Sequence, residues 1–381
     1  MIPYGRQDID QADIDAVTAV LTSDYLTQGP VVPRFEAAVA ARVGARFGVA
    51  VNSATSALHI ACMALDLGPG DLLWTVPNTF VASANCGRYC GADVDFVDID
   101  ADTYTLSIPA LEAKLRAAKA AGRLPSVLVP VHMCGQSCDM VSIGALAREY
   151  GFRVIEDASH AIGATHQGRP VGDCAHSDIC VFSFHPVKII TTAEGGMAMT
   201  NDPALAQRME MLRSHGITRD PALMTHEPDG PWYYQMLELG YNYRMTELQA
   251  ALGLSQLDRL EAFVARRHAI ADRYASLLDG LPVTAQVPLA DSRSALHLYV
   301  IRVRSGDHAS VFAALRAAGI GVNLHYIPVH LQPYYRRLGF TDGQFPQSEA
   351  YYAQAISLPM YSGLTDAGQD KVVAALRDAL A

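Results

Sequence analysis

The sequence has no apolar run that approaches the length of a membrane-spanning helix. Even its most hydrophobic segments are interrupted by charged or turn-forming residues within a few positions, whereas a spanning helix needs roughly 20 apolar residues. The first residues, MIPYGRQD, also lack the basic stretch and apolar core of a secretory signal. We therefore expect a cytoplasmic protein with no membrane partner.

Clusters of positive charge are also missing. The chain has 29 Lys and Arg against 39 Asp and Glu, a net charge of −10. Nucleic-acid binding normally needs a basic face, so nucleic acid is not expected as the main partner. The chain also offers no spare segment for a DNA-binding helix-turn-helix, which argues against a regulatory protein.

Cysteine pairs with the spacing of common zinc sites are absent. The seven cysteines include two pairs that are four residues apart, Cys86 with Cys90 and Cys134 with Cys138, and neither pair has the two-residue spacer of a zinc ribbon. Most of the cysteines lie in apolar or small-residue segments, where free cysteine behaves as a small hydrophobe. The sequence predicts no metal and a reducing compartment.

What the sequence does contain is enough apolar material for a large core. Half of its 381 residues are hydrophobic, and a chain of this length usually forms more than one domain. Between residues 45 and 200, strand-like segments alternate with helical ones at least five times. This alternation predicts a largely parallel, helix-flanked α/β sheet.

Lys188 stands at the centre of the candidate site. Residues 179–182 and 196–200 read as buried strands, so Lys188 is expected in the loop between them, with Val187 and Ile189 beside it. Apolar surroundings lower the pKa of an amine and favour its neutral, nucleophilic form. A solvated surface lysine remains the alternative on this loop alone.

Residues at the ends of three other predicted strands could bind parts of a ligand. Ser53, Ala54 and Thr55 lie at a strand-to-helix junction that suits a phosphate, although an ordinary helix cap has the same pattern. Phe80 follows a strand, where an aromatic face can cover a flat ring or simply fill the core. Asp157 ends a buried strand and needs a cation beside it, unless it only caps the next helix.

Taken together, these features match what pyridoxal 5'-phosphate (PLP) requires. They supply a phosphate cradle, a ring-stacking aromatic, a carboxylate for the ring nitrogen and a lysine for the Schiff base. Each feature alone has a structural alternative, but their combination in one chain favours the cofactor.

The motifs then resemble those of the DegT/StrS family of nucleotide-sugar aminotransferases. They are NSATSAL from residue 52, EDASHA from 156, SFHPVK from 183, TAEGG from 192 and GYNYRM from 240. The resemblance covers essentially the whole chain. His160 and Ala193 stand where many members have Gln and Gly, and in this they resemble the PseC type, which forms UDP-4-amino-4,6-dideoxy-N-acetyl-β-L-altrosamine for pseudaminic acid.

The resemblance implies fold type I of the PLP enzymes, with a large, mostly parallel sheet domain (residues 1–250) and a smaller C-terminal α+β domain (251–381). It implies that Lys188 is the catalytic residue. The cofactor contacts that it implies are Ala54, Thr55, Phe80, Asp157, His160, Ser183, Lys188 and Asn242, with Asn242 supplied by the second protomer of a homodimer. The implied sugar contacts are Tyr4, Gln28, Arg244, His325 and Tyr326.

The resemblance also implies the reaction. Glutamate donates the amino group, and Lys188 moves the protons that transfer it to a keto sugar. A UDP-linked 4-keto sugar is expected, while dTDP- or GDP-linked sugars and amination at C3 stay open. A dehydratase of the same family would carry His in place of Lys188.

The remaining segments predict a cap over the site. Residues 246–264 and 266–278 have helical patterns, as do 309–318 and 366–379. Residues 296–303 read as a strand, and residues 322–328 read as a strand with a turn. The segment 217–232 is rich in Pro, Gly and charged residues, and we expect a mobile flap near the entrance of the site.

Overall fold

The computed structural model describes residues 1–304 and 307–381. Its centre is a seven-stranded sheet in the order β1-β9-β8-β5-β4-β2-β3. The strands are β1 (Phe47–Val51), β2 (Leu72–Thr75), β3 (Asp93–Phe96), β4 (Val127–Val129), β5 (Arg153–Asp157), β8 (Ile179–Ser183) and β9 (Gly196–Thr200). Five neighbouring strands run parallel, from β3 to β8, while β9 is antiparallel to both β8 and β1. The predicted mixed, mostly parallel sheet is therefore confirmed.

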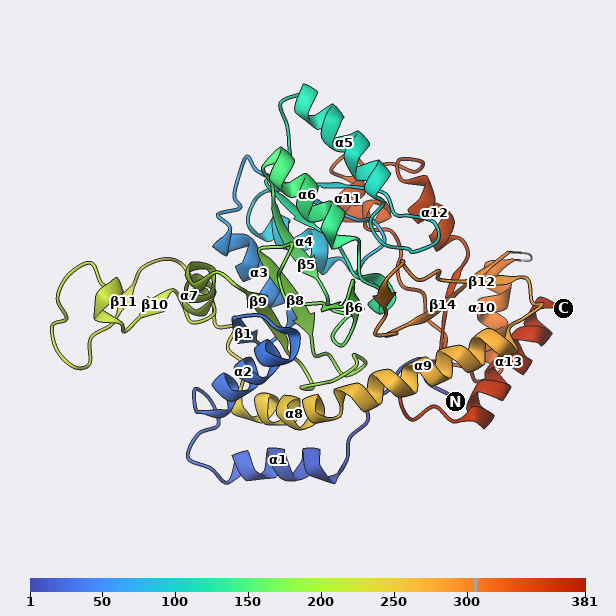
Figure 1. Ribbon diagram of the computed structural model, residues 1–381, viewed down its shortest axis with the longest axis horizontal. Helices are drawn as coiled ribbons and strands as arrows, with labels where there is room; N and C mark the ends of the chain where they lie inside the picture. The colour runs from blue at the N-terminus through green and yellow to red at the C-terminus, as the bar shows by residue number, and fades with distance from the viewer. Residues whose placement is uncertain (305–306) are drawn as a thin grey trace.

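Helices cover both faces of this sheet (Figure 1). On one face, α3 (Ala54–Ala64), α4 (Ala82–Tyr89) and α7 (Pro203–Leu212) enclose one apolar cluster. On the other, α2 (Val31–Val43), α8 (Glu247–Asp258), α5 (Ile108–Ala120) and α6 (Met140–Tyr150) enclose two more. The outer helix α1 (Gln11–Leu21) packs on α8. Because both faces are buried, β8 is buried at every position and apolar from Ile179 to Phe182.

A second, smaller sheet lies toward the C-terminus. Its strands are β12 (Val283–Ala285), β14 (Tyr299–Val303) and β15 (Ala355–Leu358), and all neighbours are antiparallel. Helices α10 (His308–Ala317), α13 (Asp366–Leu380) and part of α9 (Leu260–Leu277) pack on it around a separate apolar cluster. Two further helices are the short α11 (Pro333–Arg336) and α12 (Pro346–Tyr352). A division after residue 250 falls inside α8, and the two-domain organisation stays a prediction.

The predicted helical stretch from 246 to 278 is interrupted at Arg259. There α8 ends and α9 begins, with backbone angles φ −97° and ψ 1° at Arg259. The Arg259 guanidinium forms ion pairs with Asp8, Asp10 and Asp13. The first half of the stretch thereby stays against α1, while α9 turns toward the small sheet (Figure 1).

The predicted strand over 322–328 was wrong. Asn323 forms an isolated bridge with Ser357, but the chain then leaves the sheet edge. His325 and Tyr326 turn toward a cavity instead, and Pro328 lacks an N–H to continue a ladder. His325 and Tyr326 are therefore explained by their place in the cavity wall and not by a strand pattern.

The segment 217–232 was expected to be a flap near the entrance of the site. For the cavity of the same chain, this prediction was wrong. Strands β10 (Ile217–Thr218) and β11 (Gln235–Met236) form a hairpin that extends from α7 away from the body of the protein (Figure 1). No residue of this arm lines the cavity. Among the helices of the described residues, none is both long and apolar enough to cross a membrane.

Candidate active site

The loop between β8 and β9 holds Lys188 at one end of the large sheet. Its neck is closed by the backbone bonds Phe184 N to Gly195 O (2.9 Å) and Thr192 N to Phe184 O (3.0 Å). Ala193 inside the loop has φ 65°, a conformation that favours glycine, and its N–H donates to the Thr191 hydroxyl (2.9 Å). The hairpin neck therefore fixes where the lysine enters the site.

Lys188 lines a cavity of about 520 Å³. Its side chain keeps some accessible surface because it faces this cavity, but protein surrounds it otherwise. Burial lowers the pKa of Lys188 from 10.5 to about 8, against the smaller opposing effect of the Asp157 carboxylate. At pH 7 about one such amine in ten is neutral, far more than for an ordinary lysine. The predicted neutral nucleophile is thus chemically accessible.

Asp157 lies at the carboxyl end of β5 and lines the same cavity. It is almost fully buried, with an exposed fraction of 5%. One carboxylate oxygen, Oδ1, accepts the Ser159 N–H (3.1 Å), and the other, Oδ2, accepts the Ser83 hydroxyl (2.6 Å). A buried carboxylate at a cavity wall suits a cationic ligand group.

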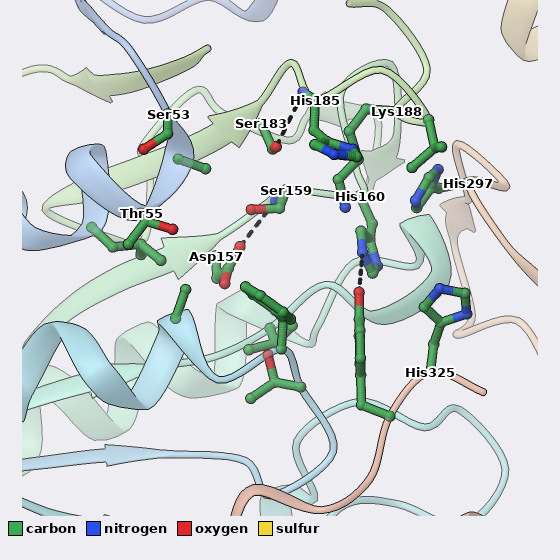
Figure 2. Close-up of a pocket in the computed structure, with 18 of the residues that line it drawn as sticks. Ser53, Thr55, Asp157, Ser159, His160, Ser183, His185, Lys188, His297 and His325 are labelled. Carbon is green, nitrogen blue, oxygen red and sulfur yellow. Dashed lines mark hydrogen bonds between the residues drawn. The ribbon is translucent and has the colours of Figure 1, made fainter. Parts of the chain in front are cut away.

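The start of α3 forms one end of the cavity. Ser53 caps the helix by accepting the Ser56 N–H (3.1 Å), and Ala54 and Thr55 begin it. The first N–H groups of a helix have no intrahelical partner and attract anions. Ser183, at the end of β8, also lines the cavity, and Figure 2 shows it across from Ser53 and Thr55.

Gly196 allows this cradle to form. A Cβ atom at Gly196 would lie 2.5 Å from the Ala54 nitrogen and 2.6 Å from the Ser53 carbonyl carbon. Only glycine therefore lets β9 begin so close to the start of α3. The close approach brings the loop that carries Lys188 against the phosphate-type end of the cavity.

Three of the predicted sugar contacts, Tyr4, His325 and Tyr326, line the cavity. Phe80, predicted to cover the cofactor ring, lines it as well. The Tyr4 and His325 rings are 5.4 Å apart between centroids, and the Tyr326 hydroxyl bonds with Nε2 of His160 (3.2 Å). Phe80 is 57% exposed and faces Tyr326 across 6.1 Å. An exposed phenylalanine at a cavity wall offers a flat apolar face.

Gln28, Asn242 and Arg244 do not line the cavity of their own chain. Gln28 follows α1 and forms part of the turn before α2, with φ 56°. Asn242 and Arg244 form isolated bridges with Ser214 and Val51. Asn242 was expected to act in the site of a second protomer, and this stays a prediction, whereas no partner was expected to use Gln28 or Arg244.

Sequence reasoning missed His297 and Ser83. His297 is buried in the cavity wall, and its ring lies 4.5 Å from that of His160. Nδ1 of both histidines has no hydrogen-bond partner among the described residues. His297 lies two residues before β14 and belongs to no recognisable motif. Only the packing of distant segments in the fold shows that it reaches the cavity. Ser83 lies one turn past Phe80 in the same segment, and its hydroxyl gave no separate signal.

Three buried histidines of the cavity have pKa values below the ordinary range of histidine. Burial, reinforced by the charge of Lys188, lowers the pKa of His160 well below its ordinary range. Burial, with the nearby His160 next, does the same for His297, and burial together with Lys188 lowers the pKa of His325 to about 3. Lys188 is then the residue that can carry a proton near neutral pH on this side of the cavity.

These residues fit PLP. Helix N–H groups and hydroxyls suit its phosphate, Asp157 suits a protonated ring nitrogen, and Lys188 is an amine of lowered pKa. Gly196 lets the start of β9 lie directly against the start of α3, the end of the cavity that suits a phosphate. In the described residues, no group of three or more His, Cys, Asp or Glu is arranged for a metal ion.

Comparisons with known proteins agree with this chemistry. A family model for the DegT/DnrJ/EryC1/StrS aminotransferase family matches residues 7–377. The spore coat polysaccharide biosynthesis protein SpsC of Bacillus subtilis (strain 168) is 40% identical over 99% of this chain and 96% of its own.

Solved structures give the same result. The putative sugar aminotransferase Spr1654 of Streptococcus pneumoniae, in its PMP form, is 30% identical with a TM-score of 0.91, covering 100% of this chain and 99% of that one. PseC of Helicobacter pylori, an aminotransferase of pseudaminic acid biosynthesis, is 30% identical with a TM-score of 0.90 and the same coverage. Spr1654 has also been solved in a PLP form. The chain therefore belongs to the PLP-dependent DegT/DnrJ/EryC1/StrS aminotransferase family.

Proposed function

We propose that this protein transfers the amino group of L-glutamate to C4 of a UDP-linked 4-keto-6-deoxy-N-acetylhexosamine. The product would be UDP-4-amino-4,6-dideoxy-N-acetyl-β-L-altrosamine, for pseudaminic acid biosynthesis. The observation that carries the transaminase chemistry is one cavity in which Lys188 lies with Asp157 and the start of α3. The choice of sugar depends on a narrower set of residues.

Each cofactor contact has a proposed role. Ala54, Thr55 and Ser183 hold the phosphate, Asp157 holds the ring nitrogen in its protonated form, Phe80 covers one ring face and His160 lies near the ring hydroxyl, all from the same cavity. Asn242 of a second protomer completes the phosphate site. Bound PLP supplies the electron sink that makes the α-hydrogen of an amino acid acidic.

Lys188 performs the proton transfers. With PLP bound, Nζ of Lys188 would hold the cofactor and would be freed when glutamate takes its place. The freed amine, whose pKa is about 8 in the unloaded protein, would be placed to accept the α-proton of glutamate and to give a proton back. With the keto sugar bound, the same amine would move protons in the opposite direction. Neutral histidines around it leave Lys188 as the group that moves the protons.

His160 and Ala193 support the choice of the PseC-type substrate. His160 lies in the cavity and bonds with Tyr326, so it can influence both the cofactor and the sugar. PseC is 30% identical to this chain. SpsC, at 40% identity, favours a second candidate, a different nucleotide-linked keto sugar destined for a polysaccharide. Lys188 speaks against a dehydratase of the same family.

A homodimer is part of the proposal because the cavity of one chain is short of positive charge. The described residues that line it include no arginine, yet a cofactor phosphate, a nucleotide diphosphate and glutamate are all anions. Arg244, Gln28 and Asn242 lie outside this cavity and are the proposed contributions of the partner. Exposed apolar side chains on or beside the β10–β11 arm, Trp232, Tyr234, Met236 and Leu239, supply surface for such an interface.

The cytoplasm is the proposed compartment. All seven cysteines are free thiols in the structure, which suits a reducing environment. Measuring the distribution of a tagged chain between cell fractions tests this point.

The substrate is tested with the purified holoprotein and a panel of keto sugars. L-Glutamate is supplied with UDP-, dTDP- and GDP-linked 4-keto and 3-keto sugars, and the products are identified by NMR. The proposal predicts the highest kcat/KM for the UDP-linked 4-keto N-acetyl sugar, with the new amine at C4 in the configuration of the β-L-altrosamine product. A higher kcat/KM for another nucleotide or for C3 would contradict it. The variant Lys188→Ala is the inactive control.

A further inference from the structure

Asp157 accepts a hydrogen bond from Ser83, a residue that does not line the cavity and has no role in the proposed reaction so far. The Ser83 hydroxyl donates to its Oδ2 over 2.6 Å, while its Oδ1 accepts the Ser159 N–H. Ser83 belongs to the first turn of α4 and is completely buried. The bond therefore joins α4 to the end of β5 across 74 residues of sequence.

The direction of this bond follows from the acceptors that Ser83 can choose. A serine hydroxyl has one proton. The Phe80 carbonyl lies 3.3 Å away and the Asp157 carboxylate 2.6 Å away, and bonds to charged acceptors are shorter and stronger. The proton therefore goes to Asp157. Thr79 Oγ1, 2.7 Å from Ser83 Oγ, is then left as the donor to Ser83.

The resulting chain runs from Thr79 through Ser83 to Asp157. Phe80 lies between its first two members in the sequence, and Thr79 and Phe80 both line the cavity. One segment, residues 79–83, thus carries the aromatic proposed for the ring face and also fixes the carboxylate proposed for the ring nitrogen. Packing of this segment sets both contacts together.

We propose that Ser83 is a positioning residue that orients the Asp157 carboxylate toward the ring nitrogen of the cofactor. The inference deepens the proposed function and rests on it, since the role of Asp157 belongs to that proposal. Without the hydroxyl, one oxygen of a buried carboxylate loses its donor. The carboxylate is then free to turn away from the ring nitrogen, and the protonated ring loses part of its stabilisation.

The test compares Ser83→Ala with a matched control, Ser348→Ala. Ser348 is also completely buried, and its hydroxyl also donates to a carboxylate, Oδ1 of Asp98 (2.7 Å), but neither residue lines the cavity. Both variants are loaded with PLP. The visible absorption is titrated with pH, and the rate at which L-glutamate converts it is measured.

We expect Ser83→Ala to react with glutamate about 10- to 100-fold more slowly, the effect of losing one hydrogen bond to a charged group. The pH midpoint of the visible absorption should also move, and Ser348→Ala should change neither quantity. Because Ser83 acts through Asp157, the same serine change made in Asp157→Asn should have little further effect on the absorption. Loss of stability alone would not move the pH midpoint.

Two results would overturn the inference. One is a Ser83→Ala protein that matches Ser348→Ala in rate and pH midpoint. The other is an undiminished effect of Ser83→Ala in the Asp157→Asn background. If the wild type forms no visible band with PLP, the proposed function itself fails. In that case the inference is decided by thermal unfolding of four unloaded proteins: the wild type, Ser83→Ala, Asp157→Asn and the double variant. Losses of stability that simply add in the double variant would rule out the Ser83–Asp157 coupling.

Discussion

Lys188 combines two opposing influences at a single atom. Burial disfavours its ammonium form, and the Asp157 carboxylate favours it less strongly, so the pKa falls to about 8. The chemistry of the site depends on this balance, because only the neutral amine attacks the cofactor aldehyde. Both influences can be changed separately.

The first prediction concerns the uptake of PLP by the unloaded protein. The rate at which the visible band forms should rise as pH increases through about 8, because neutral Lys188 becomes more abundant. Asp157→Asn removes the charge that raises the pKa of Lys188, so the midpoint of this rise should move to lower pH. Stopped-flow absorbance, recorded from neutral to alkaline pH, measures the midpoint for the wild type and for Asp157→Asn. A midpoint that stays in place or moves upward would contradict the assignment.

The second prediction concerns the stability of the unloaded protein. A lysine whose folded pKa is about 8 and whose ordinary pKa is 10.5 disfavours folding below pH 8, where it is charged in both states. This penalty fades as pH rises toward 10.5, because the unfolded state then binds more protons. Lys188→Met should therefore stabilise the unloaded protein at neutral pH, by at most about 3 kcal/mol.

Thermal unfolding at several pH values checks this second prediction. The gain in Tm of Lys188→Met over wild type should be largest below pH 8 and should shrink in alkaline buffer. An exposed lysine, Lys371→Met, is the control and should show no such pH dependence. A Tm advantage that grows with pH would show that the amine is not held in its neutral form.

Residues at strand ends were the most predictable part of the site. Asp157, Ala54 and Thr55 were expected from local sequence and Ser183 from the family resemblance; all of them line the cavity with Lys188, although their roles stay proposals. The carboxyl ends of parallel strands meet at one edge of a sheet, so local motifs gather there. His297 could not be predicted in this way, because the path of the chain before β14 brings it beside His160.

At the scale of elements, the site depends on how closely β9 begins beside α3. Gly196 has space for a hydrogen only, because a Cβ would lie 2.5 Å from the Ala54 nitrogen. The cradle, the lysine loop and the strand are therefore coupled through one glycine. Changing it should disturb all three.

The third prediction is that Gly196→Ala weakens both folding and PLP binding. Forcing the strand away from the helix start should cost about 1–3 kcal/mol, as other overpacked sites do, and should displace the N–H groups that face the phosphate. Equilibrium dialysis with PLP and thermal unfolding measure the two effects. Gly68→Ala is the control, since its Cβ would meet nothing nearer than 4.0 Å.

An unchanged PLP affinity in Gly196→Ala would argue that the start of α3 is not the phosphate cradle. A loss of affinity in Gly68→Ala as large as that in Gly196→Ala would have the same meaning, because Gly68 does not line the cavity.

Elements were predictable where packing agrees with the local pattern. The alternation of strands and helices expected between residues 45 and 200 is found around the large sheet, and the two strands expected on either side of Lys188 are β8 and β9. The misses have physical causes: Arg259 binds three aspartates and divides one helix into two, and the chain at His325 turns into the cavity. Both causes lie far away in the sequence, so local periodicity cannot report them.

At the scale of the whole molecule, the proposed site draws residues from two chains. No arginine lines the described part of its cavity, and Asn242 and Arg244 lie elsewhere. The β10–β11 arm extends away from the body (Figure 1) and exposes 72% of Trp232. These features are explained if each chain contributes residues to the site of the other, because a twofold interface repeats every contact on both subunits.

The fourth prediction is complementation between two inactive proteins. Lys188→Ala and Asn242→Ala should each be inactive or nearly so when alone. Mixed and allowed to exchange subunits, they should form hybrid dimers in which one of the two sites is intact, giving roughly a quarter of wild-type activity. A mixture that stays inactive although native mass spectrometry shows hybrids would contradict the shared site.

The most direct test of the central claim is the absorption spectrum of the purified PLP-loaded protein before and after L-glutamate. We expect a visible band from cofactor bound at Lys188, which glutamate replaces with the shorter-wavelength band of the aminated cofactor. Lys188→Ala should not form the first band. A wild type that takes up PLP with no such band, or a Lys188→Ala protein that forms it unchanged, would contradict the assignment of Lys188.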